Sequence, residues 1–122
     1  MIEVNNLTNF AVDKKFFRGV AKKVIKGENR EIENLSITFV TASEIRKLNK
    51  KYRKKDNPTD VLSFEKNLKF KDEFSEVIIC PDVVKRNSKG FKTNFKKELS
   101  NVLIHGILHI LGYDHEASKK EA

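Results

Sequence analysis

HGILHILGYDH, residues 105–115, contains all three histidines of the 122-residue chain, in the spacing HxxxHxxGxxH. His105 and His109 are four residues apart, so on an α-helix their imidazoles lie on one face, a turn apart. Gly112 can adopt the left-handed conformation that ends a helix, which would bring His115 back toward the other two. Three imidazoles suit a tetrahedral Zn²⁺ at about 2.0–2.1 Å and leave a fourth position open, as in catalytic zinc sites. The segment therefore predicts a metal-binding helix around which the fold is built.

The same segment has simpler interpretations. A single histidine is more often an ordinary polar residue than a metal ligand, and two histidines at helical spacing can arise by chance. Three histidines in one short segment, with a glycine where the chain must turn, favour the metal site. Metzincin proteases share this spacing but carry glutamate directly after the first histidine as general base. Here that residue is Gly106, which cannot accept a proton, so peptide hydrolysis by that mechanism is disfavoured.

The composition predicts a single soluble domain spanning residues 1–122, with a modest hydrophobic core. Hydrophobic residues make up 39% of the chain and charged residues 34%. Lys and Arg number 25 against 17 Asp and Glu, which gives a net charge of +8 and a sequence pI near 9.6. Such a balance favours an anionic partner, most commonly nucleic acid, although solubility alone would also explain a basic surface.

Cysteine content and hydropathy predict the compartment. Cys80 is the only cysteine, so no internal disulfide can form. The amino-terminal MIEVNNL lacks the apolar core of a signal peptide. The longest apolar run, residues 102–111, is broken at His105 and Gly106 and is too short to span a bilayer. We therefore expect a cytoplasmic protein with no membrane role.

Short β-branched or alternating apolar runs predict the strands. The clearest of them alternates apolar and polar side chains, which indicates burial mainly on one face. The weakest lies at the amino terminus, and residues 66–73 are polar and turn-like, as in a loop or a poor edge strand. Cys80 ends the last run and is expected to be a small packing residue rather than a nucleophile or ligand. The expected strands are residues 2–4, 35–40, 61–64 and 77–80.

Apolar residues at three- and four-residue spacing, with capping residues at the ends, predict the helices. Thr41 and Glu44 form a capping box, and Gly27 is placed to end the first helix. The last helix is apolar almost all round in its second half, so we expect it to pass through the centre of the molecule. The expected helices are residues 13–26, 41 to about 52, one that starts at Pro81, and one from Thr93 or Asn94 to about Leu111.

A second notable segment, KKYRKKDNPTDVLSF at residues 50–64, gathers five cations around Tyr52 before a turn at residues 56–58. A run of charges is often only a solvated face. An aromatic ring among cations is also what a groove needs if it tracks a phosphate backbone and stacks bases. The candidate RNA-binding residues are Lys50, Lys51, Arg53, Lys54 and Lys55.

Taken together, HGILHILGYDH and LNKKYRKKDNPTDVLSF, with IICPDV between them, resemble the YbeY family of bacterial endoribonucleases, also known as rRNA maturation factors. The resemblance runs from the strand at residue 35 to His115. The chain departs from the family pattern at a few positions. Ser75 and Glu76 replace a common Gly-Asp pair, Cys80 replaces a common serine, and Asn101 stands where histidine is frequent. None of these departures removes a proposed ligand.

The resemblance implies an α+β fold, a small mixed β-sheet packed by helices, with a central helix carrying the metal-binding histidines. It implies that His105, His109 and His115 bind one Zn²⁺ per chain and that Arg53 is the catalytic arginine. Imidazole also suits other divalent transition metals. The implied activity is cleavage of single-stranded RNA in 16S rRNA 3′-end maturation and ribosome quality control. The implied partners are ribosomal RNA and the small ribosomal subunit with its proteins, and we expect a monomer.

Metal-assisted phosphodiester hydrolysis is the preferred hypothesis, with Arg53 binding the scissile phosphate in two places. Asn101 or Glu98 is expected near the histidine face, where either could orient an imidazole. Two alternatives remain open: a ribosome-assembly RNA-binding factor with a mainly structural zinc, and a metallohydrolase of a non-nucleic substrate. The general acid and base are unassigned, with three carboxylates as candidates by proximity: Glu65, Asp114 and Glu116.

Overall fold

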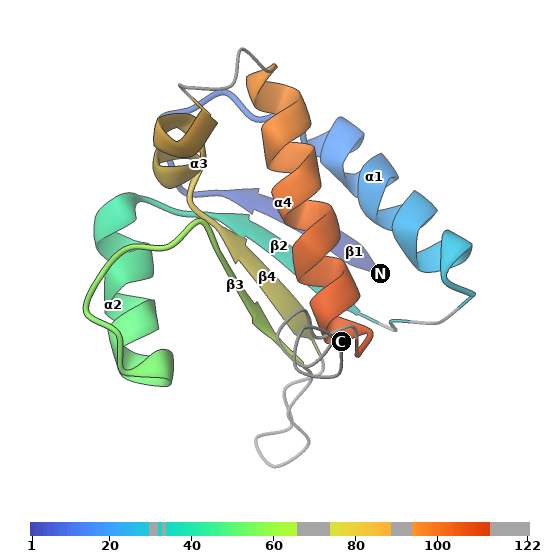
Figure 1. Ribbon diagram of the computed structural model, residues 1–122. Coiled ribbons are helices and arrows are strands. Elements are labelled where there is room, and N and C mark those ends of the chain that lie inside the picture. Colours follow the sequence, from blue (N-terminus) through green and yellow to red (C-terminus); the bar gives the residue numbers. More distant parts are fainter. Residues whose placement is uncertain (30–31, 33, 66–73, 89–93, 113–122) are drawn as a thin grey trace, which may run out of the picture.

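The computed structural model describes residues 1–29, 32, 34–65, 74–88 and 94–112, and within these ranges it forms a four-stranded sheet with four helices (Figure 1). The predicted α+β class with a mixed sheet is confirmed. The strands are β1 (Ile2–Asn6), β2 (Leu35–Phe39), β3 (Val61–Phe64) and β4 (Ser75–Ile79). The helices are α1 (Lys14–Gly27), α2 (Ala42–Arg53), α3 (Pro81–Ser88) and α4 (Phe95–Ile110).

The sheet has the strand order β1-β2-β4-β3. β1, β2 and β4 run parallel, and β3 pairs antiparallel with β4 at one edge. The parallel pairs are joined through helices, as parallel neighbours require a crossover connection. In the β3–β4 register Ser63 lies opposite Val77, so these two side chains point to the same face of the sheet. Among the strands that the structure describes, β3 is an edge strand.

Helices cover both faces of the sheet, which gives the molecule two hydrophobic clusters. Leu35, Ile37 and Phe39 alternate along β2 and face the cluster that includes residues of α1 and α4. Ile45 of α2 packs on the opposite face against Leu62 of β3 and its neighbours. The prediction that the strand now seen as β2 is buried mainly on one face is only partly right, because its Ser36, on the other face, is also buried, at 5% exposure.

Local capping signals account for most helix starts. Thr41 accepts a hydrogen bond from the Glu44 N–H at 3.3 Å, as the capping box predicted. Of the two candidates for the last helix, Asn94 is the cap, and its Oδ1 accepts from the Lys96 N–H at 2.8 Å. Pro81 begins α3 as expected. These boundaries depend on side chains two or three residues away, which is why they could be predicted from sequence.

Several boundaries differ from expectation. α1 continues through Gly27, and the residue with positive φ is Asn29, at 51°, so Gly27 does not cap the helix. Asparagine tolerates this conformation better than most residues because its short polar side chain bonds locally. β4 starts at Ser75 rather than Val77, because it pairs along its whole length with β2. Residues 66–73, expected to form a loop or edge strand, lie outside the described residues.

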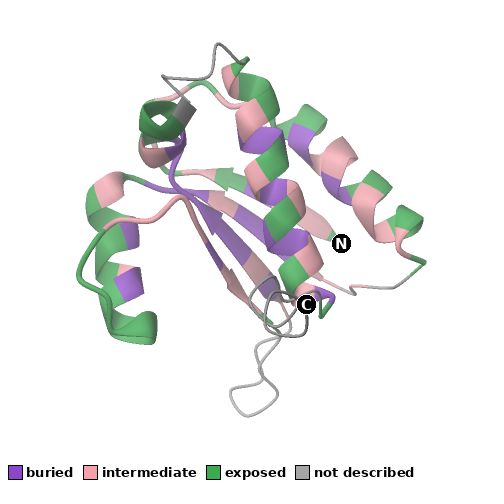
Figure 2. Cartoon of the chain, in the orientation of Figure 1, coloured by how far each residue is buried: buried purple, intermediate pink, exposed green. Residues whose placement is uncertain are grey.

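α4 lies on the sheet between α1 and α3, in the central position that was expected (Figure 1). It is not buried all round, however. Leu103 and Ile107 are fully buried, whereas Asn101, His105 and His109 are exposed along the opposite side (Figure 2). Apolar residues on the flanks of α4 are only partly covered, and its exposed polar residues lie on the side away from the described sheet. Among the described residues, no helix combines the length and hydropathy needed to cross a bilayer.

Candidate active site

His105 and His109 lie on the exposed side of α4, separated by one helical turn. Leu103 and Ile107, on the buried side of the same helix, pack into the core and have no exposed surface. The backbone positions of the two histidines are therefore fixed by packing, while their imidazoles face solvent. Side chains held in this way can bind an exogenous group without reorganising the helix.

Gly106, between the two histidines, packs directly against the sheet. A β-carbon added at this residue would lie 2.8 Å from Val77 Cγ1, 3.1 Å from Ser63 Oγ and 3.3 Å from Val61 Cγ2. Ser63 Oγ donates a hydrogen bond to the Gly106 carbonyl at 3.0 Å, which ties β3 directly to this turn of α4. The glycine is thus required by packing, and a glutamate at this position would point into the sheet rather than toward the histidines.

The end of α4 has the predicted geometry. Gly112 adopts a φ of 101°, a region that side chains rarely allow, and its N–H donates to the His109 carbonyl at 3.1 Å. The chain can therefore leave the helix axis directly after the histidine turn. His115, the third predicted ligand, lies outside the described residues, as do Asp114 and Glu116. Within the described ranges no three His, Cys, Asp or Glu residues form a metal-binding group.

The donors that the structure describes fit a transition metal. Two imidazoles at i and i+4 on one exposed helix face are a common pair of ligands for zinc and related ions. Of the residues suggested to orient them, Asn101 is exposed and Glu98 is partly buried on the same helix. Glu65, the one carboxylate suggested as acid or base that the structure describes, is exposed just after β3. These roles stay predictions.

The predicted cation cluster lies at the end of α2 and is exposed throughout: Lys50, Lys51, Arg53, Lys54 and Lys55. Lys54 closes the helix in the left-handed conformation, with φ 57°, and its N–H donates to the Lys50 carbonyl at 3.1 Å. Tyr52, within the cluster, is 55% exposed, and the Lys51 Nζ lies 5.2 Å from its ring centroid. An exposed ring among cations is available for base stacking.

Asn49 fixes the shape of this turn and was not singled out from the sequence. It is 2% exposed, its side-chain Nδ2 donates to the Asn57 carbonyl at 2.8 Å, and its main-chain carbonyl accepts from the Lys55 N–H at 3.3 Å. Asn49 therefore bonds to two residues of the turn that follows Arg53. Arg46 adds an exposed ion pair to Asp56 at 2.9 Å, and this hydrogen bond holds the pKa of Asp56 below its ordinary value. The sequence signal that could have identified Asn49 is a polar residue on the inner face of an amphipathic helix.

β3 connects the cation cluster to the histidine helix. Ser63 bonds to Gly106 of α4, whereas the next residue, Phe64, packs edge to face against Tyr52 of α2 with ring centroids 5.1 Å apart. Successive strand residues point to opposite faces, so one short edge strand holds an element on each side. His105 and Arg53, which are neighbours of these contact residues, are thereby held at the two sides of the same sheet edge.

Cys80 is fully buried, and burial raises the pKa of its thiol. A protonated, inaccessible thiol is neither a nucleophile nor a metal ligand. The prediction that it is a small packing residue is confirmed.

A family model described as "Endoribonuclease YbeY" matches residues 3–122. An endoribonuclease YbeY of Thermotoga neapolitana is 39% identical over 111 residues, covering 89% of this chain and 72% of the relative. The corresponding protein of Persephonella marina is 39% identical over 116 residues, covering 92% and 76%. The solution structure of the Thermotoga maritima protein TM1509 superposes with a TM-score of 0.65 at 32% identity, covering 94% of this chain and 75% of that one.

Replacing Gly106 with alanine is expected to destabilise the fold. The added β-carbon meets Val77, a stiff, fully buried side chain that cannot rotate away, so α4 must shift. Such overpacking costs about 1–3 kcal/mol in the free energy of unfolding, measurable by urea denaturation. Gly19 is the matched control, because it lies inside α1 with no atom within 4 Å of an added β-carbon. Gly19→Ala should instead stabilise by about 0.5–1 kcal/mol; equal effects of the two substitutions would contradict the packing role of Gly106.

Asn49→Ala should loosen the turn that follows Arg53. The substitution removes the hydrogen bond to Asn57 and leaves a buried gap, at a cost of about 1–3 kcal/mol. Hydrogen exchange of the Lys55 amide should become faster. Arg46→Ala, which breaks only the exposed ion pair, is the control and should leave stability and exchange nearly unchanged. Unchanged exchange in Asn49→Ala would show that the turn is held by something else.

Proposed function

The chain belongs to the YbeY endoribonuclease family, and on that premise we propose that it is a metal-dependent endoribonuclease, a hydrolase of RNA phosphodiester bonds. The observation that carries the proposal is the exposed pair His105 and His109 on a helix that Gly106 packs against the sheet. This arrangement offers metal ligands to solvent but lacks a protease's glutamate, and a basic, aromatic cluster lies at the same sheet edge. Phosphodiesters are the substrates that such a combination fits.

His105, His109 and His115 would hold one metal ion per chain, Zn²⁺ first, with other divalent transition metals also compatible with imidazole. When bound, the ion would supply Lewis-acid chemistry, drawing charge from a phosphate oxygen and easing deprotonation of water. The protein's part is to hold the imidazoles in the correct orientation. Asn101 and Glu98 are the residues proposed to accept an imidazole N–H and so set its tautomer.

Arg53 would act on the phosphate itself. Its guanidinium is planar and can donate two parallel hydrogen bonds to phosphate oxygens. Bound to the scissile group, it would stabilise the negative charge that grows in the transition state. Lys50, Lys51, Lys54 and Lys55 would hold the neighbouring phosphates. Tyr52 would stack a base, which requires unpaired nucleotides and so favours single-stranded RNA.

Proton transfer is assigned to no residue. Glu65 is the candidate in the described part of the chain, because it is exposed at the end of the strand that bonds to α4. Asp114 and Glu116 are candidates by sequence alone. A general base must reach the proton it removes within a hydrogen-bond distance, so only a substrate complex can choose between these three carboxylates.

The cellular role proposed for the chain is the one that its resemblance implied: maturation of the 16S rRNA 3′ end and ribosome quality control. Its partners would then be ribosomal RNA and the small ribosomal subunit with its proteins. The proposed active unit is a single domain over residues 1–122, acting as a monomer in the cytoplasm. The net charge of +8 supports an RNA substrate, because phosphate neutralisation supplies most of the non-specific binding energy.

The zinc-loaded protein should cleave single-stranded RNA and leave double-stranded RNA and peptide intact. His109→Ala should abolish this cleavage and lower zinc content, measured by gel assay and by metal analysis at several salt concentrations. Equal cleavage by both proteins would indicate a contaminating nuclease. RNA binding that falls steeply with salt, without cleavage at any metal loading, would instead favour an assembly factor with a structural zinc. Peptide cleavage would favour a different hydrolase.

Arg53→Ala should lower turnover about a hundredfold or more while zinc content stays unchanged, since one transition-state donor contributes about 2.7–4 kcal/mol. Arg53→Lys should stay impaired, because a lysine keeps the charge but not the two-point geometry. Lys55→Ala is the control within the same cluster and should weaken RNA binding with little change in turnover. If Arg53→Ala keeps its turnover and loses only affinity, Arg53 is a binding residue.

A further inference from the structure

α1 carries most of the net charge of the molecule and plays no part in the proposed site. Its residues include six of the chain's 25 Lys and Arg and none of its 17 Asp and Glu. The helix therefore accounts for +6 of the net charge of +8. The rest of the chain is close to balanced. A charge this concentrated on one element calls for an explanation other than general solubility.

The cations of α1 lie on one side. Counted at 100° per residue, its lysines fall within one half of the helix circumference, and all are exposed: Lys14, Lys15, Lys22, Lys23 and Lys26. Arg18 lies among them, partly buried, with its Nε donating to the Ile2 carbonyl at 3.2 Å. Cations at positions 14, 18, 22 and 26 form three consecutive i,i+4 pairs of like charge. Each such pair costs an isolated helix about 0.2–0.5 kcal/mol, which an anionic partner would relieve.

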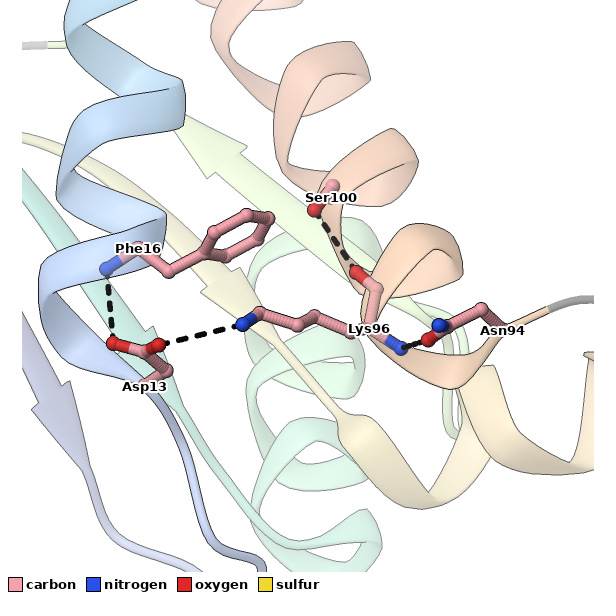
Figure 3. Close-up of polar contacts among 5 residues, drawn as sticks. All are labelled: Asp13, Phe16, Asn94, Lys96 and Ser100. Carbon is pink, nitrogen blue, oxygen red and sulfur yellow. Dashed lines mark hydrogen bonds and ion pairs between the residues drawn. The ribbon is translucent and has the colours of Figure 1, made fainter.

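The acidic residue nearest to the start of α1 is already engaged (Figure 3). Asp13 accepts hydrogen bonds from the Phe16 N–H at 3.0 Å and from Lys96 Nζ of α4 at 3.3 Å. These contacts lower the pKa of Asp13, the N–H bond contributing most. Among the described residues, no carboxylate forms an ion pair with any of the five exposed lysines of α1. Their charge is therefore available to a ligand.

A membrane surface fits α1 poorly. Amphipathic helices that bind bilayers insert their apolar face into the lipid. Here that face is occupied, because Phe17 and Ala21 are buried at 2% and 0% exposure in the core beneath α4. A helix that served solubility alone could use glutamate as readily as lysine. An exclusively basic face on a packed helix matches a phosphate backbone better than either of these.

We infer that the lysine face of α1 is a second RNA-binding surface, separate from the cation cluster of α2; this inference rests on the proposed function. α2 and α4 both pack on β3, the strand at one end of the sheet order, whereas α1 contacts β1 at the other end (Figure 1). A short oligonucleotide bound at the β3 edge therefore does not extend to α1. α1 lies beside α4 on the histidine side, and Lys14 to Lys26 span about 18 Å along the helix. The surface takes the phosphates of a further segment of a large, folded RNA.

The test compares two charge-matched variants. Lys22→Gln, Lys23→Gln and Lys26→Gln together neutralise half of the α1 cations and keep helix-forming side chains. The control, Lys47→Gln, Arg86→Gln and Lys97→Gln, removes the same charge from exposed positions scattered over α2, α3 and α4. Fluorescence anisotropy measures binding to a short single-stranded oligonucleotide and to the same oligonucleotide extended by a stem-loop. Thermal melts check folding, and the α1 variant should melt no lower than wild type because like-charge repulsion falls.

The α1 variant should bind the extended RNA about tenfold more weakly than wild type near physiological salt. The slope of log affinity against log salt should fall by about 2 to 3, which is about 0.7–0.9 for each of three phosphate contacts. Binding and cleavage of the short oligonucleotide should be unchanged. Equal weakening by the scattered control would show that only net charge matters and would overturn the inference, as would unchanged binding of the extended RNA.

Two further outcomes separate this inference from the proposed function. If wild type binds the extended RNA through α1 but cleaves no RNA, the endoribonuclease proposal fails and the α1 surface stands. If wild type cleaves RNA and the α1 variant binds every RNA normally, the endoribonuclease proposal stands and the α1 inference fails. The last measurement is binding to vesicles that contain phosphatidylserine. Loss of vesicle binding in the α1 variant, with RNA binding intact, would assign the surface to anionic lipid and overturn the inference.

Discussion

At Gly106 the backbone of α4 lies against Val77 and Ser63 with no room for a β-carbon. This contact sets the depth at which the helix lies on the sheet and turns His105 and His109 away from the core. It also explains in one step why the segment has the spacing of a metzincin without its glutamate. A residue that must touch the sheet cannot also reach solvent. The loss of the protease's base is thus a consequence of how the helix packs.

β3 extends this constraint to the other half of the proposed site. It is a short edge strand, yet Ser63 bonds to α4 on one face while Phe64 packs on Tyr52 of α2 on the other. Asn49, buried on α2, then fixes the turn that follows Arg53. Candidate site residues from elements far apart in sequence are in this way anchored by packing while remaining exposed. Exposed cations can reach a polymer substrate, and buried anchors keep their spacing.

Helix ends that depend on nearby residues were predicted from the sequence, whereas features that depend on contacts between separate elements were missed. The cap at Thr41, the start of α3 and the positive φ of Gly112 follow from residues close by in the chain and were predicted, and Asn94 is one of the two caps proposed for the last helix. The exposed side of α4 was missed, because a count of apolar residues cannot tell which flank a neighbouring helix covers. Asn49 was also missed, since its partner lies eight residues on and beyond a turn. The role of each histidine stays a prediction.

The most direct measurement of the central claim is a Zn²⁺ titration followed by NMR of the histidine imidazole nitrogens. If packing at Gly106 presents His105 and His109 as ligands and the turn at Gly112 brings His115 back, all three imidazoles respond together. The change is complete at one equivalent of zinc per chain, and the amides of the buried residues beneath α4 move little. A response of only two histidines, or saturation at another ratio, would contradict a single three-histidine centre.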